Sequence, residues 1–251
     1  MRALTRGVAT SFATALSAKP RASPIDVALA RQQVAAYRAA LEALGVAVTT
    51  LAADERYPDC VFVEDTAMVA DDLALIARSG APSRRGESEA VAAALAPHFE
   101  LAYVTEPATL DGGDCMRLGS TIYVGRSART NAAGIARLDE AFAPRGFRVV
   151  AVDLPPDVLH LKCVCSPLGD GRVLLARATL PGSTFDADIV WVAAEDGYAA
   201  NAVAVGDRVI AAAEYPRCHD ALAAAGFAIH PVPTSEVRKA DGSLTCQSIL
   251  Y

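Results

Sequence analysis

Apolar and polar positions follow a repeating pattern along this chain. Between residues 27 and 44, apolar residues recur at steps of three and four, which predicts one buried face of a helix that opens at Ser23 and Pro24. Shorter apolar runs have the length of strands, and Asp71 with Asp72 forms a turn between two of them. The predicted elements that follow the first helix are strands at 46–48, 61–70, 73–77 and 101–104 and an Ala-rich helix at 86–96.

The order strand, tight turn, strand, helix, strand then returns three times. We predict strands at 115–118, 121–124 and 147–152 with a helix at 131–142, a third unit over 161–192 with a weak helix signal at 179–188, and a fourth over 201–229. Only four hairpins are complete. A fifth unit must therefore be closed by the last predicted strand, 244–250, together with a strand-like segment at 3–12.

A polar residue opens each of the five units. These residues are Asp65, Asp111, His160, Asn201 and Cys246, and the separations between them are 46, 49, 41 and 45 residues. A regular period of this size indicates a radial or solenoid arrangement. If equivalent strand ends face a common axis, two acids, an imidazole, an amide and a thiol converge there. The alternative is that they are unrelated loop residues.

Cys246 lies at the mouth of the last predicted strand, after a turn at 241–242 in which glycine takes a positive φ. Taken alone, such a cysteine is more often a small core residue. With His160 it forms the nucleophile and proton-transfer pair that thiol chemistry needs. Asp111 or Asp114 would fix the tautomer of the histidine, and the two glycines between them let the backbone turn sharply near a ligand.

Three carboxylates, those of Asp59, Glu64 and Asp65, lie at and inside the edge of an apolar segment. Neighbours on a strand face opposite sides, so at least one of Glu64 and Asp65 points inward. A buried carboxylate needs a cationic partner. That partner is either the substrate or an internal ion pair with Arg84 or Arg85.

Arg84 and Arg129 occupy equivalent places in successive units, after the second hairpin strand and before the helix. The planar guanidinium group is a forked clamp for a carboxylate. Two such clamps opposite three acids describe a pocket for a zwitterion that carries an additional positive group.

Composition narrows the classes of function. The 251 residues are 53% hydrophobic and 21% charged with a net charge of −6, which argues against nucleic acid or an anionic membrane as the partner. No apolar run approaches the ~20 residues that span a bilayer. The six cysteines and four histidines lack the spacing of a disulfide framework or a metal site. We therefore expect a cytoplasmic protein with free thiols and no metal.

Seven motifs in this chain resemble those of one enzyme family. They are Asp59-x-Val-Phe-Val-Glu-Asp65, Pro82-Ser-Arg-Arg85, Leu110-Asp-Gly-Gly-Asp114, Ser127-Ala-Arg-Thr-Asn131, Leu159-His-Leu-Lys162, Tyr198-Ala-Ala-Asn201 and Asp241-Gly-x-Leu-Thr-Cys246. As a set they cover essentially the whole chain, and they are similar to those of dimethylarginine dimethylaminohydrolase (dimethylargininase), of the guanidine-modifying (pentein) superfamily. The resemblance implies a single domain, 1–251, folded as a five-bladed pseudosymmetric α/β propeller, in agreement with the repeat.

The resemblance also assigns roles to individual residues. Cys246 would be the nucleophile, His160 the general acid and base, and Asp111 the carboxylate that orients the histidine. Substrate contacts would come from Leu16, Asp59, Glu64, Asp65, Arg84, Arg129 and Ala240. In that set Asp65 would hold the guanidinium group, and the two arginines would bind the substrate carboxylate.

Two positions depart from the pattern of some family members. Gln247 follows the nucleophile where some members carry a second cysteine, and Asp111 stands where some bacterial members have glutamate. The three acids would place negative charge near Cys246 and raise its pKa. We therefore expect a neutral thiol in the free protein.

The implied activity is hydrolysis of Nω-methylated L-arginines to L-citrulline and methylamine or dimethylamine, through a covalent thiouronium on Cys246 and without a cofactor. The expected partner is a small-molecule substrate, and a homodimer is considered as the assembly. One alternative is an arginine deiminase or another amidino-group enzyme, although deiminases of this superfamily usually carry an extra helical insertion. Another is a non-catalytic arginine-binding protein, which would need neither Cys246 nor His160.

Overall fold

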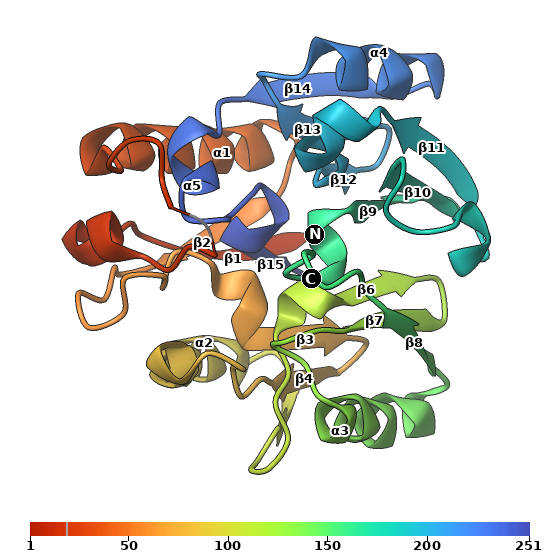
Figure 1. Ribbon diagram of the computed structural model, residues 1–251. Coiled ribbons are helices and arrows are strands. Elements are labelled where there is room, and N and C mark those ends of the chain that lie inside the picture. The colour runs from red at the N-terminus through yellow and green to blue at the C-terminus, as the bar shows by residue number, and fades with distance from the viewer. Residues whose placement is uncertain (19) are drawn as a thin grey trace.

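Five three-stranded sheets are arranged around a central axis in the computed structural model, which describes residues 1–18 and 20–251 (Figure 1). In four of them an antiparallel hairpin leads through a connection into a third strand that is parallel to the second. These sheets are β3 (Ala67–Ala70), β4 (Leu73–Ile76) and β5 (Glu100–Tyr103); β6 (Cys115–Leu118), β7 (Thr121–Arg126) and β8 (Arg148–Asp153); β9 (Cys165–Gly169), β10 (Arg172–Ala176) and β11 (Asp188–Val192); and β12 (Val203–Val205), β13 (Arg208–Ala212) and β14 (Ala228–Val232).

The connections before the third strands differ in helical content. Three contain α-helices, which are α2 (Ser88–Leu95), α3 (Ala132–Phe142) and α4 (Pro216–Ala224). The connection of the third unit contains only a short 3-10 turn, η7 (Gly182–Thr184), where the helix signal in the sequence is weak. The repeat that the sequence predicts is therefore confirmed, with one blade lacking its helix.

The fifth sheet joins segments from both ends of the sequence. It has the order β15 (Ser248–Leu250), β1 (Arg2–Arg6) and β2 (Ala47–Leu51), with β1 antiparallel to β15 and parallel to β2. Inner strands of neighbouring sheets then contact one another, β3 with β15 and β9 with both β6 and β12. The predicted closure of the ring by the 244–250 segment is confirmed.

The helix that connects β1 and β2, α1 (Val27–Ala43), begins later than predicted. Asp26, not Ser23, is the N-cap residue, because its carboxylate accepts a hydrogen bond from the N–H of Leu29 at 3.0 Å. On the buried face, the Tyr37 hydroxyl lies 2.7 Å from that of Ser248. This hydrogen bond fixes the helix against the strand that directly follows the Cys246 turn.

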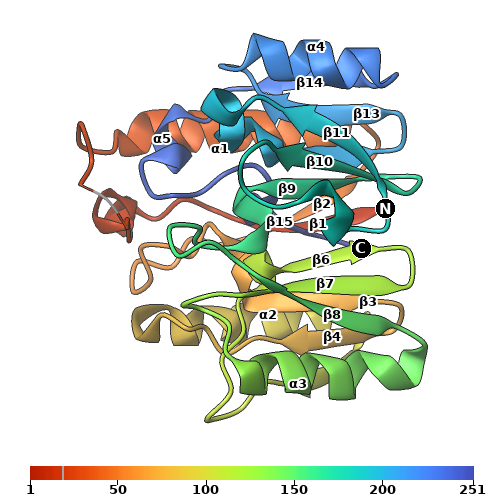
Figure 2. The ribbon, with the colours of Figure 1, turned by 45° about the vertical axis from the view of Figure 1, so that its right-hand side comes forward.

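The apolar faces of the helices pack against the sheets. Figure 2 shows α3 and α4 at opposite ends of the molecule, outside the strands. On α3, Leu138 and Phe142 are buried against Ile122 of β7 and Leu75 of β4. Each such side chain contributes about 1.5–3 kcal/mol by leaving water. In the described part of the chain, no helix has the length and apolar character to cross a membrane.

A 3-10 turn precedes the first strand of each sheet near the axis. These turns are η2 (Val63–Thr66), η4 (Gly112–Asp114), η6 (Leu161–Cys163), η8 (Ala194–Ala200) and η9 (Thr245–Gln247). The strands predicted over 61–70 and 244–250 are therefore wrong in their first halves. A tight turn lets adjacent side chains face inward together, so Glu64 and Asp65 are both buried, where a strand would have separated them.

Two glycines let these turns approach one another closely. A Cβ on Gly112 would lie 2.0 Å from the backbone oxygen of Glu64, and one on Gly113 would lie 2.7 Å from the His160 ring. Neither glycine has a positive φ, so their role is close packing and not the sharp turn predicted. At 241–242 the left-handed residue is Asp241, with φ 55°, whereas a Cβ on Gly242 would meet the ring of Phe62 at 2.2 Å.

We predict that Gly112→Ala lowers the free energy of unfolding by about 1–3 kcal/mol, because backbone atoms cannot move aside as a flexible side chain can. Gly197→Ala is the matched control, since a Cβ there would lie an ordinary 3.7 Å from Ala176. Chemical denaturation of the two variants and the parent provides the measurement. Equal stability of both variants would show that the centre of the ring is not crowded.

Candidate active site

Cys246 and His160 line one cavity of about 160 Å³ near the axis. Cys246 lies in η9, and His160 directly precedes η6. The predicted residues that share this lining are Leu16, Asp59, Asp65, Arg84, Arg129 and Ala240. Glu64 lines an adjoining cavity that also reaches Cys246 and His160, and Asp111 contacts the His160 ring. The structure thus brings all of the predicted site residues together.

The imidazole of His160 is held between two carboxylates. Its Nε2 lies 3.2 Å from Oδ2 of Asp111, and its Nδ1 lies 3.8 Å from Oδ1 of Asp65. Burial alone would lower the pKa of His160, but the charges of Asp65, Asp111 and Asp114 outweigh burial and raise that pKa to about 9. The ring is therefore a protonated imidazolium at neutral pH.

Asp111, and not Asp114, is the carboxylate that contacts the ring. The fully buried Asp111 also accepts the N–H of Gly80 at 3.0 Å. Asp114 instead accepts the N–H of Leu161 at 3.0 Å and the hydroxyl of Ser127 at 2.6 Å. It therefore fixes the turn that follows the histidine, while Asp111 fixes the ring.

Cys246 is a neutral thiol in this environment. Burial raises its pKa well above the ordinary value, and the negative charges of Glu64 and Asp65 raise it further. The direction agrees with the expectation from the sequence. Burial is the larger cause, however, and it becomes visible only once the turns are packed together.

The buried carboxylate of Asp65 has an internal cationic partner. Nη1 of Arg84 lies 2.5 Å from Oδ2 of Asp65, and the same guanidinium donates to Glu87 and to the carbonyl oxygen of Phe62. Burial would raise the pKa of Asp65, but His160 and Arg84 outweigh it and lower the pKa to about 2. Arg84 lines the cavity, yet most of its donors are already used within the protein. Glu87, which is 1% exposed, has no role in the prediction from sequence.

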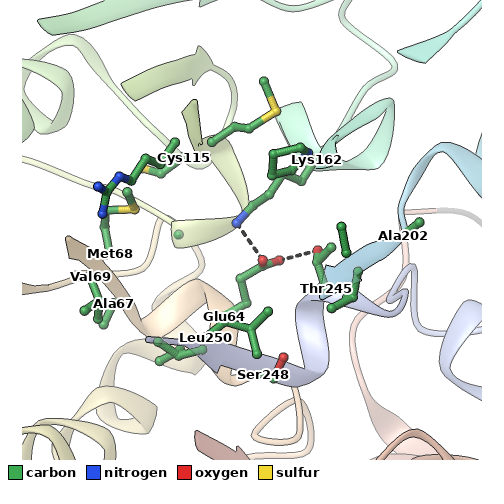
Figure 3. Close-up of a pocket in the computed structure, with 17 residues that line it drawn as sticks. Glu64, Ala67, Met68, Val69, Cys115, Lys162, Ala202, Thr245, Ser248 and Leu250 are labelled. Atoms are coloured by element: carbon green, nitrogen blue, oxygen red, sulfur yellow. Dashed lines mark hydrogen bonds and ion pairs between the residues drawn. The ribbon is translucent and has the colours of Figure 1, made fainter. Parts of the chain in front are cut away.

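Glu64 forms a second buried ion pair, with Lys162. The distance from Nζ to Oε1 is 2.6 Å, and the Thr245 hydroxyl donates to the other carboxylate oxygen at 2.7 Å (Figure 3). Lys162 belongs to the motif around His160 but carries no role in the sequence-based prediction. The pair lines both the cavity next to Cys246, of about 270 Å³, and another of about 250 Å³ toward β3 and β15.

The segment around Leu16 is held over the cavity by two aspartates. The N–H of Leu16 donates to the carboxylate of Asp59 at 3.0 Å, and the N–H of Ala18 donates to Asp241 at 2.5 Å. Leu16 itself is 39% exposed. The contact of Asp241 is not foreseeable from the sequence, because the two segments lie more than two hundred residues apart.

Asn201 supports the turn that carries Cys246 through hydrogen bonds to Lys162 and Thr245. Its amide donates to the carbonyl oxygen of Lys162 at 2.8 Å and to the hydroxyl of Thr245 at 2.9 Å, and it accepts the Thr245 N–H at 2.9 Å. Its predicted place near the axis is correct. Its contacts join the turn of Cys246 to the segment of His160.

Asp65, Asp111 and His160 also offer three ligand atoms within 4.8 Å of one another. Arg84 already pairs with the first carboxylate and Arg129 with the second, at 3.4 Å. A divalent cation would have to displace or repel these guanidinium groups and the imidazolium. The charge of the cluster therefore fits proton transfer better than metal binding.

Comparison with known proteins gives consistent relatives. A family model described as "N,N dimethylarginine dimethylhydrolase, eukaryotic" matches residues 11–192. The chain is 36% identical to the N(G),N(G)-dimethylarginine dimethylaminohydrolase of Pseudomonas aeruginosa, over 99% of this chain and 98% of the relative. Identity to the protein of the same name from Streptomyces coelicolor is 39%, over 99% and 96%.

Solved structures agree with these sequence relatives. A cysteine-to-serine mutant of the Pseudomonas aeruginosa protein, complexed with citrulline, has a TM-score of 0.94 and 35% identity, over 99% of this chain and 98% of that chain. The N-terminal domain of ArgZ, a cyanobacterial arginine dihydrolase, shares the fold, with a TM-score of 0.87 and 20% identity over 99% and 97%. The predicted pentein fold is confirmed. On these matches, the chain belongs to the dimethylarginine dimethylaminohydrolase family.

Proposed function

We propose that this protein hydrolyses Nω-methylated L-arginines to L-citrulline and methylamine or dimethylamine. The observation that carries the proposal is that a half-buried thiol and an imidazolium line one cavity, together with the acids Asp59 and Asp65 and with Arg129. Such a cavity fits a zwitterion with a cationic head group. The names and the citrulline complex of the relatives support the same substrate class.

In the proposed reaction the bound guanidinium group favours loss of the Cys246 thiol proton to solvent. The thiolate then attacks the guanidinium carbon, and His160 gives its proton to the departing amine. A covalent thiouronium on the sulfur results. His160, now neutral, takes a proton from water, which attacks the same carbon. Collapse of that adduct expels the sulfur and leaves citrulline. Asp111 holds the His160 ring in place through both steps.

Substrate binding divides between the two ends of the zwitterion. Asp65 would hold the guanidinium group, with Glu64 beside it, and Asp59 and the backbone at Ala240 would face the amino group. Arg129 is 17% exposed and would carry most of the carboxylate contact, because Arg84 is largely committed to Asp65 and Glu87. Arg84 would then contribute to substrate binding mainly by holding Asp65 in position. The lid residue Leu16 would cover the bound substrate.

The proposal extends to the domain organisation, the cofactor requirement, the location and the assembly of the protein. Residues 1–251 would act as one domain, because turns from all five sheets meet at one site. No resident cofactor is needed for the steps above. A cytoplasmic location and a homodimer complete the proposal, and sedimentation of the purified protein tests the assembly.

An arginine deiminase is the rival activity, and a non-catalytic arginine-binding protein is the rival from another class. Incubation with arginine, monomethylarginine and the two dimethylarginines, followed by citrulline measurement, separates them. We expect citrulline from methylated substrates. Citrulline from arginine alone would favour the deiminase, and binding without citrulline would favour the binding protein.

We predict that Cys246→Ser lowers kcat by at least about 10³-fold while the substrate still binds, since a hydroxyl is a poor nucleophile without a strong base. Citrulline production and calorimetric binding of dimethylarginine give the two measurements. Cys218→Ser is the matched control, because that buried thiol belongs to α4, donates to the carbonyl oxygen of Ala199 and lines neither cavity at Cys246. Activity of Cys246→Ser within a few fold of the parent would contradict the assignment.

We predict that Arg129→Lys raises KM by about 10–100-fold with a smaller change in kcat, because lysine cannot form the bidentate clamp. Arg85→Lys is the control, since Arg85 is exposed and donates only to the carbonyl oxygen of Ser79 in the described structure. Steady-state kinetics of both variants provide the test. An unchanged KM with a collapsed kcat would rule out the clamp.

We predict that alkylation of free Cys246 by a neutral haloacetamide rises with pH to beyond pH 9 without a plateau at pH 6, because burial and the nearby acids raise the pKa of the thiol. Bound guanidinium offsets Glu64 and Asp65, so the ultraviolet absorbance of the thiolate should increase at neutral pH when substrate is added. Cys246→Ser supplies the background from the other cysteines. A plateau at pH 6 would instead indicate a resting thiolate–imidazolium pair.

A further inference from the structure

One buried oxygen at the centre of the site is shared by two cations. Oδ2 of Asp111 lies 3.2 Å from Nε2 of His160 and 3.4 Å from Nη1 of Arg129. The Asp111 side chain is 0% exposed, so water does little to screen either interaction. Asp111 therefore divides its charge between the ring that would protonate the leaving amine and the arginine that would bind the substrate carboxylate.

The backbone of Arg129 is held by several close contacts, whereas its guanidinium group is held weakly. The backbone N–H donates to the hydroxyl of Ser127 at 3.0 Å, and a Cβ on Gly80 would lie 2.4 Å from the carbonyl oxygen of Arg129. The guanidinium, by contrast, lines the cavity, and among residues 1–18 and 20–251 its one hydrogen-bond partner is Asp111, at a long 3.4 Å. The short bonds of Arg84 to Asp65 and Glu87 hold that arginine more tightly.

Binding of a cationic substrate would lower the pKa of His160. Among the charges that favour the protonated ring, that of Asp65 is the largest. Asp65 is also the carboxylate that would receive the guanidinium of the substrate. A cation bound there offsets the negative charge of Asp65, and the protonated form of His160 becomes less favourable. The general acid would then lose its proton as its substrate arrives.

We propose that the substrate carboxylate draws the guanidinium of Arg129 away from Asp111, and that Asp111 then gives its whole charge to His160 and keeps this general acid protonated in the complex. The inference rests on the proposed hydrolysis and gives Arg129 a second role in it. Besides binding the carboxylate, Arg129 couples carboxylate binding to the protonation of His160 through Asp111. Substrates without an α-carboxylate would therefore be disfavoured in the chemical step as well as in binding.

The other ionisable groups around the ring are the same whether or not the ligand carries a carboxylate. Besides Asp65, Asp111 and Arg129, they are Asp114 of η4, Arg84, and the residues that share the two cavities with His160, namely Asp59, Glu64, Asp157, Lys162, Cys163, Tyr198, Arg238, Asp241 and Cys246. Two ligands with the same guanidinium group, one with and one without the carboxylate, thus isolate the effect of Arg129.

The test uses Cys246→Ser protein, saturated with either Nω,Nω-dimethyl-L-arginine or its decarboxylated counterpart, dimethylagmatine. The imidazole of His160 is followed by NMR with isotope-labelled histidine as pH is raised. We expect the midpoint of its titration to lie higher with dimethylarginine, by about half a pH unit or more. Equal midpoints would overturn the inference and leave the proposed hydrolysis standing. Failure of both ligands to bind would defeat the proposed function itself.

Arg129→Gln, in the same Cys246→Ser background, decides whether the effect passes through this arginine. Asp111 then interacts with His160 alone, whichever ligand is bound. The titration midpoint of His160 should therefore be high in both complexes, and the difference between the two ligands should disappear. Arg129→Lys keeps the positive charge and should retain part of the difference. A full difference in Arg129→Gln would overturn the inference, because the carboxylate would then act on the ring directly. Far-ultraviolet circular dichroism checks that each variant is folded.

Discussion

Pairing of buried charges at the centre of the ring is the constraint on which the rest of this structure depends. Removing one partner of a buried ion pair typically costs about 3–5 kcal/mol, because the other charge is left without compensation. Here Asp65 has Arg84, Glu64 has Lys162, and Asp111 has His160 and Arg129. Each partner comes from a different turn or loop around the axis. The three blades β3–β5, β6–β8 and β9–β11 must therefore be in register for these charges to balance.

This balance also explains the local geometry of the turns. A strand would have directed one of Glu64 and Asp65 toward the outside, but the 3-10 turn η2 buries both. Glycines at 112 and 113 let η4 approach that turn within a distance that any side chain would prevent. Close approach of the turns in turn raises the pKa of both the thiol and the imidazole. The close packing of the turns therefore also sets the protonation states of Cys246 and His160.

Most of the fold and much of the site follow from the sequence, for identifiable reasons. Regular spacing of the chemically distinct residues predicts the ring, and apolar periodicity predicts the hairpins and helices that build it. What the sequence does not disclose are contacts between distant segments. The pairing of Glu64 with Lys162 and the hold of Asp241 on Ala18 depend on how the blades pack, and neither has a signal in local spacing. Short apolar runs suit both strands and tight turns, so local sequence predicts strand at 63–66 and 245–247, where the structure has 3-10 turns.

Closure of the fifth sheet has a consequence for the order of events during synthesis. Thr5 of β1 pairs with Ser248 of β15, at a separation of 243 residues in the sequence, so all of the chain between them must be made before the two strands can meet. Contacts of such sequence separation form slowly, because a long loop must close before they contribute any stability. Cys246 lies two residues before that pair. On the ribosome, the proposed nucleophile Cys246 and the strand that closes the ring therefore emerge together. A partly made chain can present the acids and the imidazole of the site, but it does not yet carry the sulfur that would react.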